Sequence, residues 1–246
     1  MNWYARTEQL LKRSKVEKLA KSSVAVFGMG GVGSYAVEAL ARSGIGHLRL
    51  VDFDTVNPSN INRQLFALTT TVDKPKVVLA QERVAAINPD CKVDGRGVFI
   101  NADTVEGLLE PAVDVVVDAI DSVSSKVNLI VAAYEKRLPV VTSMGAGGRT
   151  DSSQIRSGDI SESTICPLAR IIRKRLHRRG VYEGIRCIYS VERAENKLPY
   201  NEEDADGPPV HGRARTPIGT ISYMPGIFGL KVAEEAIKML LKNVGE

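Results

Sequence analysis

Polar residues gather in one short stretch, DFDTVNPSNINRQ at residues 52–64, directly after an apolar segment typical of a β-strand. Two aspartates stand two positions apart, and Asn60, Arg63 and Gln64 follow them. Carboxylates, amides and a guanidinium in one cluster can bind a ribose hydroxyl and phosphate oxygens. Asp54 would equally suit a turn, because aspartate favours such positions.

A glycine-rich segment precedes this stretch and has the spacing GxGxxG between a predicted strand and a predicted helix. Glycine permits the tight turn and lets backbone N–H groups approach phosphate oxygens, and the helix N-terminus adds partial positive charge. Asp52 lies 19 residues after Gly33, at the end of the next strand, where such folds bind a ribose hydroxyl. The pattern predicts a nucleotide site formed by Gly28, Gly30, Gly31, Gly33 and Asp52.

The chemistry around this site favours ATP over NAD. Hydride transfer needs a catalytic group beside the nicotinamide, and the three histidines of the chain stand in no evident catalytic setting. Attack of a carboxylate on the α-phosphorus of ATP needs no general base, but it does need cations, hydrogen-bond donors and a metal around the triphosphate. Arg63 and Lys76 supply cations, and Asp121, which ends an apolar run at 113–121, can hold magnesium together with phosphate oxygens.

The segments GMGGVG, VDFDTV, SNINRQ, KPKV and DAIDS resemble the motifs of the ubiquitin-activating-enzyme-like superfamily, which includes the adenylyltransferases of molybdopterin and thiamine biosynthesis. The resemblance implies a homodimer in which Arg6 of one subunit reaches the phosphates of the other. The remaining roles that it implies are ribose binding by Asp52, triphosphate contacts by Asn60 and Arg63, charge neutralisation by Lys76 and magnesium coordination by Asp121. Asp54 and Gln64 fit the same pattern.

Further segments resemble one branch, the tRNA threonylcarbamoyladenosine dehydratases: DAIDSVSSKVNLI, VTSMGAGGRTDSSQI, ICPLARIIRKRL and CIYSVE. The resemblance implies that ATP adenylylates the threonyl carboxylate of the modified adenosine and that the carbamoyl nitrogen then closes a ring with loss of water. Proximity makes the second step easy, so no covalent enzyme intermediate is required. Cys166, which precedes a proline where some relatives are expected to have aspartate, and Cys187 are accordingly interpreted as structural.

Two alternatives remain open: an adenylyltransferase that activates the C-terminus of a ubiquitin-like sulfur-carrier protein, and a nucleotide-dependent binding module without turnover. The sequence has no pair of CxxC motifs, so no zinc is expected. It leaves open a sulfur-transfer partner and a monovalent-cation site.

An RNA substrate should leave an electrostatic signature, and residues 164–179 are predicted to form a basic helix. We expect this helix to contact RNA phosphates, although a basic run can also be a solvated face. Arg149, Arg213 and Arg215 can add to the same surface. The cations of the run are Arg170, Arg173, Lys174, Arg175, Arg178 and Arg179.

The elements that position these residues alternate between strands and helices, which predicts an α/β fold: a doubly wound, Rossmann-like, mainly parallel sheet with added antiparallel strands and a C-terminal helix. One domain over 1–246 is expected, with an N-terminal helix at 6–20, a nucleotide-binding core at 22–150 and a second half at 151–246 that contains a mobile loop at 193–216. Strands are predicted at 23–28, 47–54, 91–98, 113–121, 138–145, 153–160 and 185–192, and the other helices at 34–44, 74–88, 123–137 and 225–242. Helix 74–88 is expected to turn Val77, Val78, Val84 and Ile87 inward.

The bulk composition agrees with a globular enzyme of 246 residues, with 43% hydrophobic and 25% charged residues. Three widely spaced cysteines form no disulfide framework, which indicates a reducing cytoplasm. No apolar run is long enough to suggest a membrane span. The net charge of +4 permits an anionic partner.

Overall fold

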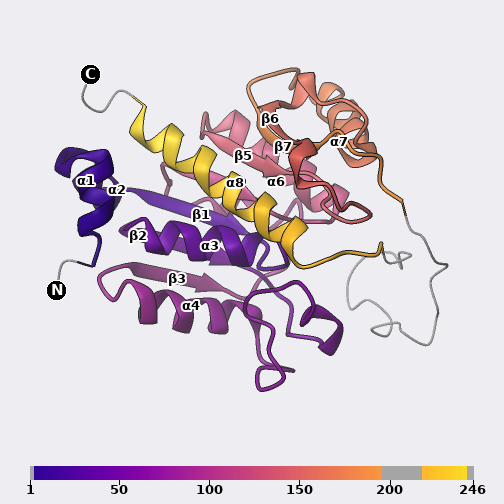
Figure 1. The fold of residues 1–246 in the computed structure, drawn as a ribbon. Coiled ribbons are helices and arrows are strands. Elements are labelled where there is room, and N and C mark those ends of the chain that lie inside the picture. Colours follow the sequence, from indigo (N-terminus) through magenta and orange to yellow (C-terminus); the bar gives the residue numbers. More distant parts are fainter. Residues whose placement is uncertain (1–2, 196–217, 243–246) are drawn as a thin grey trace.

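A seven-stranded sheet organises the protein, in the order β3-β2-β1-β4-β5-β7-β6 (Figure 1). The computed structural model describes residues 3–195 and 218–242. Every neighbouring pair is parallel except β6 and β7, which are antiparallel. The strands are β1 (Ser23–Phe27), β2 (His47–Val51), β3 (Lys92–Arg96), β4 (Val115–Asp118), β5 (Val140–Ser143), β6 (Ile155–Asp159) and β7 (Arg186–Ser190).

This topology confirms the doubly wound fold, and it places β3 at an edge and β4 in the centre, as predicted. The second half needs one correction. The strands predicted at 153–160 and 185–192 were the candidates for the added antiparallel strands, but β7 runs parallel to β5 and continues the central sheet. Only β6, which returns along the outer edge of β7, is antiparallel.

Helices cover both faces of the sheet, with α3 and α8 on one face and α6 and α7 on the other (Figure 1). The α-helices are α1 (Ala5–Leu11), α2 (Arg13–Lys21), α3 (Gly33–Arg42), α4 (Lys76–Ile87), α5 (Val105–Leu108), α6 (Val123–Glu135), α7 (Pro167–His177) and α8 (Tyr223–Leu241). Short 3-10 turns within the described residues are η1 (Pro58–Asn60), η2 (Ser152–Gln154) and η3 (Ile160–Glu162).

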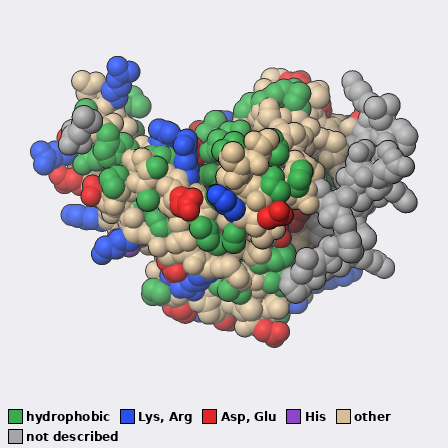
Figure 2. All heavy atoms as spheres, turned by 90° about the horizontal axis from the view of Figure 1, so that it is seen from below, with side chains coloured by type: hydrophobic (Ala, Val, Ile, Leu, Met, Phe, Trp, Pro, Cys, Tyr) green, Lys and Arg blue, Asp and Glu red, His purple; other side chains and the backbone are tan. Residues whose placement is uncertain are grey.

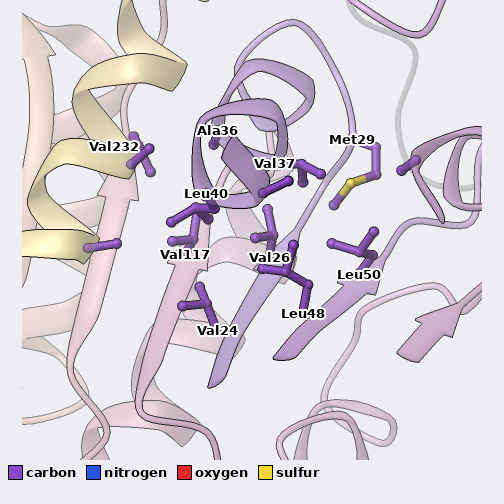
Figure 3. Close-up of a cluster of buried hydrophobic side chains, with 14 of the residues drawn as sticks. Val24, Val26, Met29, Ala36, Val37, Leu40, Leu48, Leu50, Val117 and Val232 are labelled. Atoms are coloured by element: carbon purple, nitrogen blue, oxygen red, sulfur yellow. The ribbon is translucent and has the colours of Figure 1, made fainter. Parts of the chain in front are cut away.

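Strand β1 supplies side chains to two cores, because successive residues of a strand point to opposite faces. Val24 and Val26 pack beneath α3 and α8 (Figure 3). Ala25 and Phe27 pack against the cluster beneath α5, α6 and α7. Since all these residues are fully buried, β1 is fixed from both sides, and so is the loop that follows its carboxyl end.

Two helix predictions were wrong in detail. The helix expected at 6–20 is broken at Lys12, which has φ 67° and separates α1 from α2. Helix α2 is anchored through buried Val16 and Leu19, whereas α1 has no fully buried residue and contacts the core only through its last residue, Leu11. In α4, Val78 is 41% exposed, and Leu79 and Ala80 are buried instead.

The loop predicted at 193–216 lies outside the described residues from position 196 onward. Within the described ranges, no helix is long and apolar enough to cross a membrane.

Candidate nucleotide-binding site

The glycine loop between β1 and α3 is packed so tightly that three of its residues have little or no room for a side chain. Gly28 has φ 90°, and a Cβ there would lie 2.8 Å from the carbonyl oxygen of Ala119. A Cβ on Gly33 would lie 1.7 Å from the carbonyl oxygen of Gly28, and one on Gly31 would lie 3.1 Å from Pro225 at the start of α8. The loop is therefore held between the β4–α6 connection and α8.

Gly30 is the exception, because its Cβ position faces open space. The nearest atom is the side-chain nitrogen of Gln64, at 3.9 Å. Gln64 is itself buried, and its Oε1 has no hydrogen-bond partner among residues 3–195 and 218–242. A buried acceptor without a donor is costly, so it marks a position where a ligand can supply one.

Asp52, at the carboxyl end of β2, is bound directly to this loop. Its Oδ2 accepts a hydrogen bond from the Met29 N–H at 2.5 Å, and its Oδ1 accepts one from the Asp54 N–H at 2.8 Å. Burial raises the pKa of the Asp52 carboxyl above its ordinary value, because desolvation disfavours the charged form. Each carboxylate oxygen keeps a further lone pair, so a ribose hydroxyl can still donate to it.

Lys76 is buried at the first turn of α4 and pairs with Asp54 through an Nζ–Oδ2 distance of 2.9 Å. Its backbone N–H also donates to the Asp54 carbonyl oxygen at 3.0 Å. The start of α4 is thereby joined to the segment that follows β2. A buried ammonium held by one half-exposed carboxylate can exchange that partner for a phosphate oxygen.

The segment around η1 brings Asn60, Arg63 and Gln64 beside the glycine loop. Asn60 is buried, and its Oδ1 accepts from the Asn57 N–H in a capping box. Arg63 donates to the Ser59 carbonyl oxygen at 2.7 Å. The segment is tied to α3, because the Leu65 N–H donates to the Ser34 hydroxyl at 3.1 Å. The sequence did not reveal that the Asn60 side chain shapes its own turn.

Asp121 is exposed in the connection between β4 and α6, on the same edge of the sheet. Beneath it lies a buried network that the sequence analysis missed. The Lys126 ammonium lies 2.6 Å from Asp118 Oδ2 and also donates to the Thr142 hydroxyl and the Ser143 carbonyl oxygen. Lys126, Asp118 and Thr142 are all fully buried. The available signal was a lysine directly before the apolar residues Val127, Leu129 and Ile130 of α6.

This network fixes the connection that carries Asp121. The other carboxylate oxygen of Asp118 accepts from the Ile120 N–H at 3.1 Å, and Ala119 is the residue that contacts Gly28. The ion pair therefore supports both the glycine loop and Asp121.

Arg6 is the one predicted site residue that does not join the others within a single chain. It is exposed on α1, which precedes α2. The Gly46 N–H donates to the Leu19 carbonyl oxygen, which places the end of α2 beside the amino end of β2. That edge of the sheet is opposite to the glycine loop.

Neither thiol of the second half is placed for covalent catalysis. Cys187 is fully buried in β7, and burial raises the pKa of its thiol. Cys166 is buried at the start of α7.

The side chains of this site have the chemistry that ATP and magnesium require. The open space at Gly30, the unpartnered Gln64 oxygen and the fixed acid Asp52 fit a nucleotide. The exposed carboxylate of Asp121 provides an oxygen ligand of the kind that magnesium takes from proteins, with phosphate oxygens completing the shell. The donor set present therefore fits both groups.

Comparison with known proteins assigns the family. The ThiF family model matches residues 4–246. The chain belongs to the ThiF family. Among ThiF-type relatives, the tRNA threonylcarbamoyladenosine dehydratase of Bacillus subtilis is 35% identical over 249 residues, which cover 99% of this chain and 96% of that protein.

Two further comparisons separate the branches of the family. The crystal structure of the Escherichia coli tRNA N6-threonylcarbamoyladenosine dehydratase TcdA in complex with ATP superimposes with a TM-score of 0.85 at 32% identity, covering 97% of this chain and 93% of that one. The molybdopterin-synthase adenylyltransferase of Salmonella typhimurium is 35% identical, but only over 126 residues, 51% of this chain and 50% of that protein.

Proposed function

We propose that this protein is an ATP-dependent dehydratase that acts on threonylcarbamoyladenosine in tRNA. The observation that carries the proposal is the extent of the similarity. The match to the Bacillus subtilis dehydratase spans 99% of the chain, including its second half, whereas the match to the molybdopterin-synthase adenylyltransferase spans 51%. A match along nearly the whole chain supports the dehydratase more strongly than a match along half of it supports the adenylyltransferase.

In the proposed complex, ATP lies along the carboxyl edge of the sheet. Asp52 accepts a hydrogen bond from the ribose, and the backbone N–H groups of the loop that contains Gly28, Gly30, Gly31 and Gly33 donate to phosphate oxygens. Gln64 Oε1 accepts a hydrogen bond from the nucleotide, which gives this buried oxygen the partner that it lacks among the described residues. Asn60 and Arg63 contact the triphosphate from η1 and the turn that follows it.

The first chemical step is attack of the threonyl carboxylate oxygen on the α-phosphorus, with pyrophosphate as the leaving group. Lys76 and Arg63 offset the repulsion between the two anions, and Lys76 releases Asp54 as it does so. Magnesium, when bound, neutralises charge on the phosphate oxygens, and Asp121 would hold it.

In the second step, the carbamoyl nitrogen of the same nucleoside attacks the activated carbonyl carbon and loses its proton, and AMP leaves with the former carboxylate oxygen. The ring closes, and the nucleoside has lost one water overall. Both reacting groups belong to one side chain, so orientation alone accelerates the step. No enzyme thiol is needed, which agrees with the burial of Cys166 and Cys187.

The functional form is proposed to be a homodimer, located in the cytoplasm. Arg6 lies on a helix with no buried residue and far from the site of its own chain, so it is available to the phosphates of a second subunit. A sulfur-transfer protein partner and a monovalent cation are not needed by this chemistry.

The proposal is tested by mass spectrometry of nucleosides after tRNA that contains threonylcarbamoyladenosine is incubated with the protein, ATP and magnesium. The expected product is a nucleoside lighter by one water that forms only with ATP. Lys76→Ala and Asp121→Ala should abolish it, whereas Lys74→Ala, a change at an exposed neighbouring lysine, should not.

Other outcomes point elsewhere. ATP–pyrophosphate exchange that requires a ubiquitin-like protein instead of tRNA would favour the sulfur-carrier adenylyltransferase. Saturable ATP binding without pyrophosphate release would indicate a binding module.

A further inference from the structure

Helix α7 and the turns that flank it form the most one-sided charged segment of the described chain. Residues 163–182 contain no carboxylate, although six arginine and lysine residues lie among them. On the face shown in Figure 2, by contrast, acidic and basic side chains are interspersed. A surface of mixed charge serves solubility, whereas a surface of one sign attracts a polyanion.

The structure divides these cations into two groups. Arg173 is half-buried, and its Nη1 donates to the Ser163 carbonyl oxygen at 2.7 Å, the Ser163 hydroxyl at 2.7 Å and the Ile160 carbonyl oxygen at 3.3 Å. It fastens α7 to η3. Because these bonds hold one nitrogen of the guanidinium inside the protein, Arg173 is less available to an RNA phosphate than its exposed neighbours.

The outward stripe consists of Arg170 and Lys174, one helical turn apart, followed by Arg178. All three side chains are exposed, and the opposite face of α7 buries Ala169, Ile172 and Leu176 in the core. The core contact fixes the rotation of the helix, so the stripe is presented to solvent in a defined direction.

Helix α7 lies beside the candidate nucleotide site. Arg175 Nη1 donates to the hydroxyl of Ser124 in the first turn of α6, three residues after Asp121. At the other end of the helix, a Cβ on Gly145, after β5, would lie 4.0 Å from Leu168. A polyanion bound along α7 would therefore lie next to the edge of the sheet that carries the nucleotide.

An aromatic group adjoins the same surface. Tyr182 is 61% exposed, and its ring lies 5.1 Å from the ring of His177, the last residue of α7. Exposed rings next to cations suit single-stranded RNA loops, whose unstacked bases stack on aromatic side chains.

We infer that the surface formed by Arg170, Lys174, Arg178 and Tyr182 binds the backbone and loop bases of the RNA substrate and so presents the modified base to the nucleotide site. This inference rests on the proposed function for the identity of the RNA. Arg149, which was expected to add to this surface, does not belong to it: it is buried, and it donates to the Gly145 and Gly147 carbonyl oxygens.

The test uses the full chain with Arg170→Glu and Lys174→Glu combined. The control, Lys21→Glu with Lys92→Glu, makes the same change in net charge at two exposed lysines on the amino edge of the sheet. Equilibrium binding of tRNA that contains threonylcarbamoyladenosine is measured at several salt concentrations. The α7 variant should bind tRNA more weakly. A plot of the logarithm of the association constant against the logarithm of the salt concentration should also be less steep by about 2, because each lost phosphate contact reduces the steepness by about 1.

The control should keep the wild-type slope, and both variants should keep the wild-type affinity for ATP. Arg170→Gln with Lys174→Gln serves as a second variant that introduces no new charge. Unchanged tRNA affinity in the α7 variants, or an equal loss in the control, would overturn the inference. Turnover by the wild-type protein, measured in parallel, reports on the proposed function separately, because the binding comparison does not depend on catalysis.

Discussion

Replacing Lys126 by methionine is expected to destabilise this protein strongly, although the side chains have similar length. The ammonium lies 2.6 Å from Asp118 Oδ2, and both side chains are completely buried. At an effective dielectric constant of about 20, charges at that distance attract with about 6 kcal/mol, and desolvation offsets much of this. Methionine would remove the attraction and leave the cost of burying Asp118.

The loss of one partner from a buried pair costs about 3–5 kcal/mol, a large part of a total stability of about 5–15 kcal/mol. Asp118→Asn combined with Lys126→Met removes both charges and keeps an acceptor for the Ile120 N–H. The double-mutant cycle should therefore give a coupling free energy in the upper part of the range of about 0.5–3 kcal/mol found for contacting residues.

Urea unfolding followed by circular dichroism measures these free energies. Lys136→Met is the control, since Lys136 is 30% exposed and forms surface pairs with Glu106 and Glu110. It should cost much less than Lys126→Met, because solvent screens exposed ion pairs. If Lys126→Met destabilised the protein no more than Lys136→Met, the Lys126–Asp118 pair would not be what holds the β4–α6 connection in place.

Three further predictions concern single positions. Gly33→Ala should abolish ATP binding in calorimetry, because the new Cβ would meet the Gly28 carbonyl oxygen at 1.7 Å; Gly107→Ala, with no atom within 4 Å, should instead stabilise α5 by up to about 1 kcal/mol. Arg173→Met should lower the melting temperature through the loss of about 1–3 kcal/mol and leave the salt dependence of tRNA binding unchanged; a normal melting temperature would contradict its assigned contacts. Because burial raises the pKa of Asp52, the folded state holds the proton of this carboxyl more tightly than the unfolded state does. The free energy of unfolding should therefore fall as the pH rises from the ordinary aspartate pKa through the pKa of Asp52 in the folded protein. Asp52→Asn should remove that component, and parallel pH profiles for the two proteins would refute it.

Much of the nucleotide site was predictable because its signals are local. The GxGxxG spacing predicted the turn at Gly28, and the apolar strand before Asp52 predicted an acid at the sheet edge. The structure places Asp52 directly after β2, and it adds a hydrogen bond from the Met29 N–H to Asp52 that the sequence did not predict. Backbone sterics and the alternation of strand side chains act within a few residues, so the sequence alone expresses them.

The sequence by itself thus determined the βα alternation, the parallel sheet, the glycine loop and the basic character of α7. Only the tertiary structure decided which basic side chains face solvent and which form bonds inside the protein. Arg170 and Arg173 are equivalent in the sequence, yet one faces solvent while the other is bonded to η3. Likewise, Lys126 finds its partners on two neighbouring strands. Helical periodicity gives each side chain a direction, but what lies in that direction depends on the placement of segments distant in the chain.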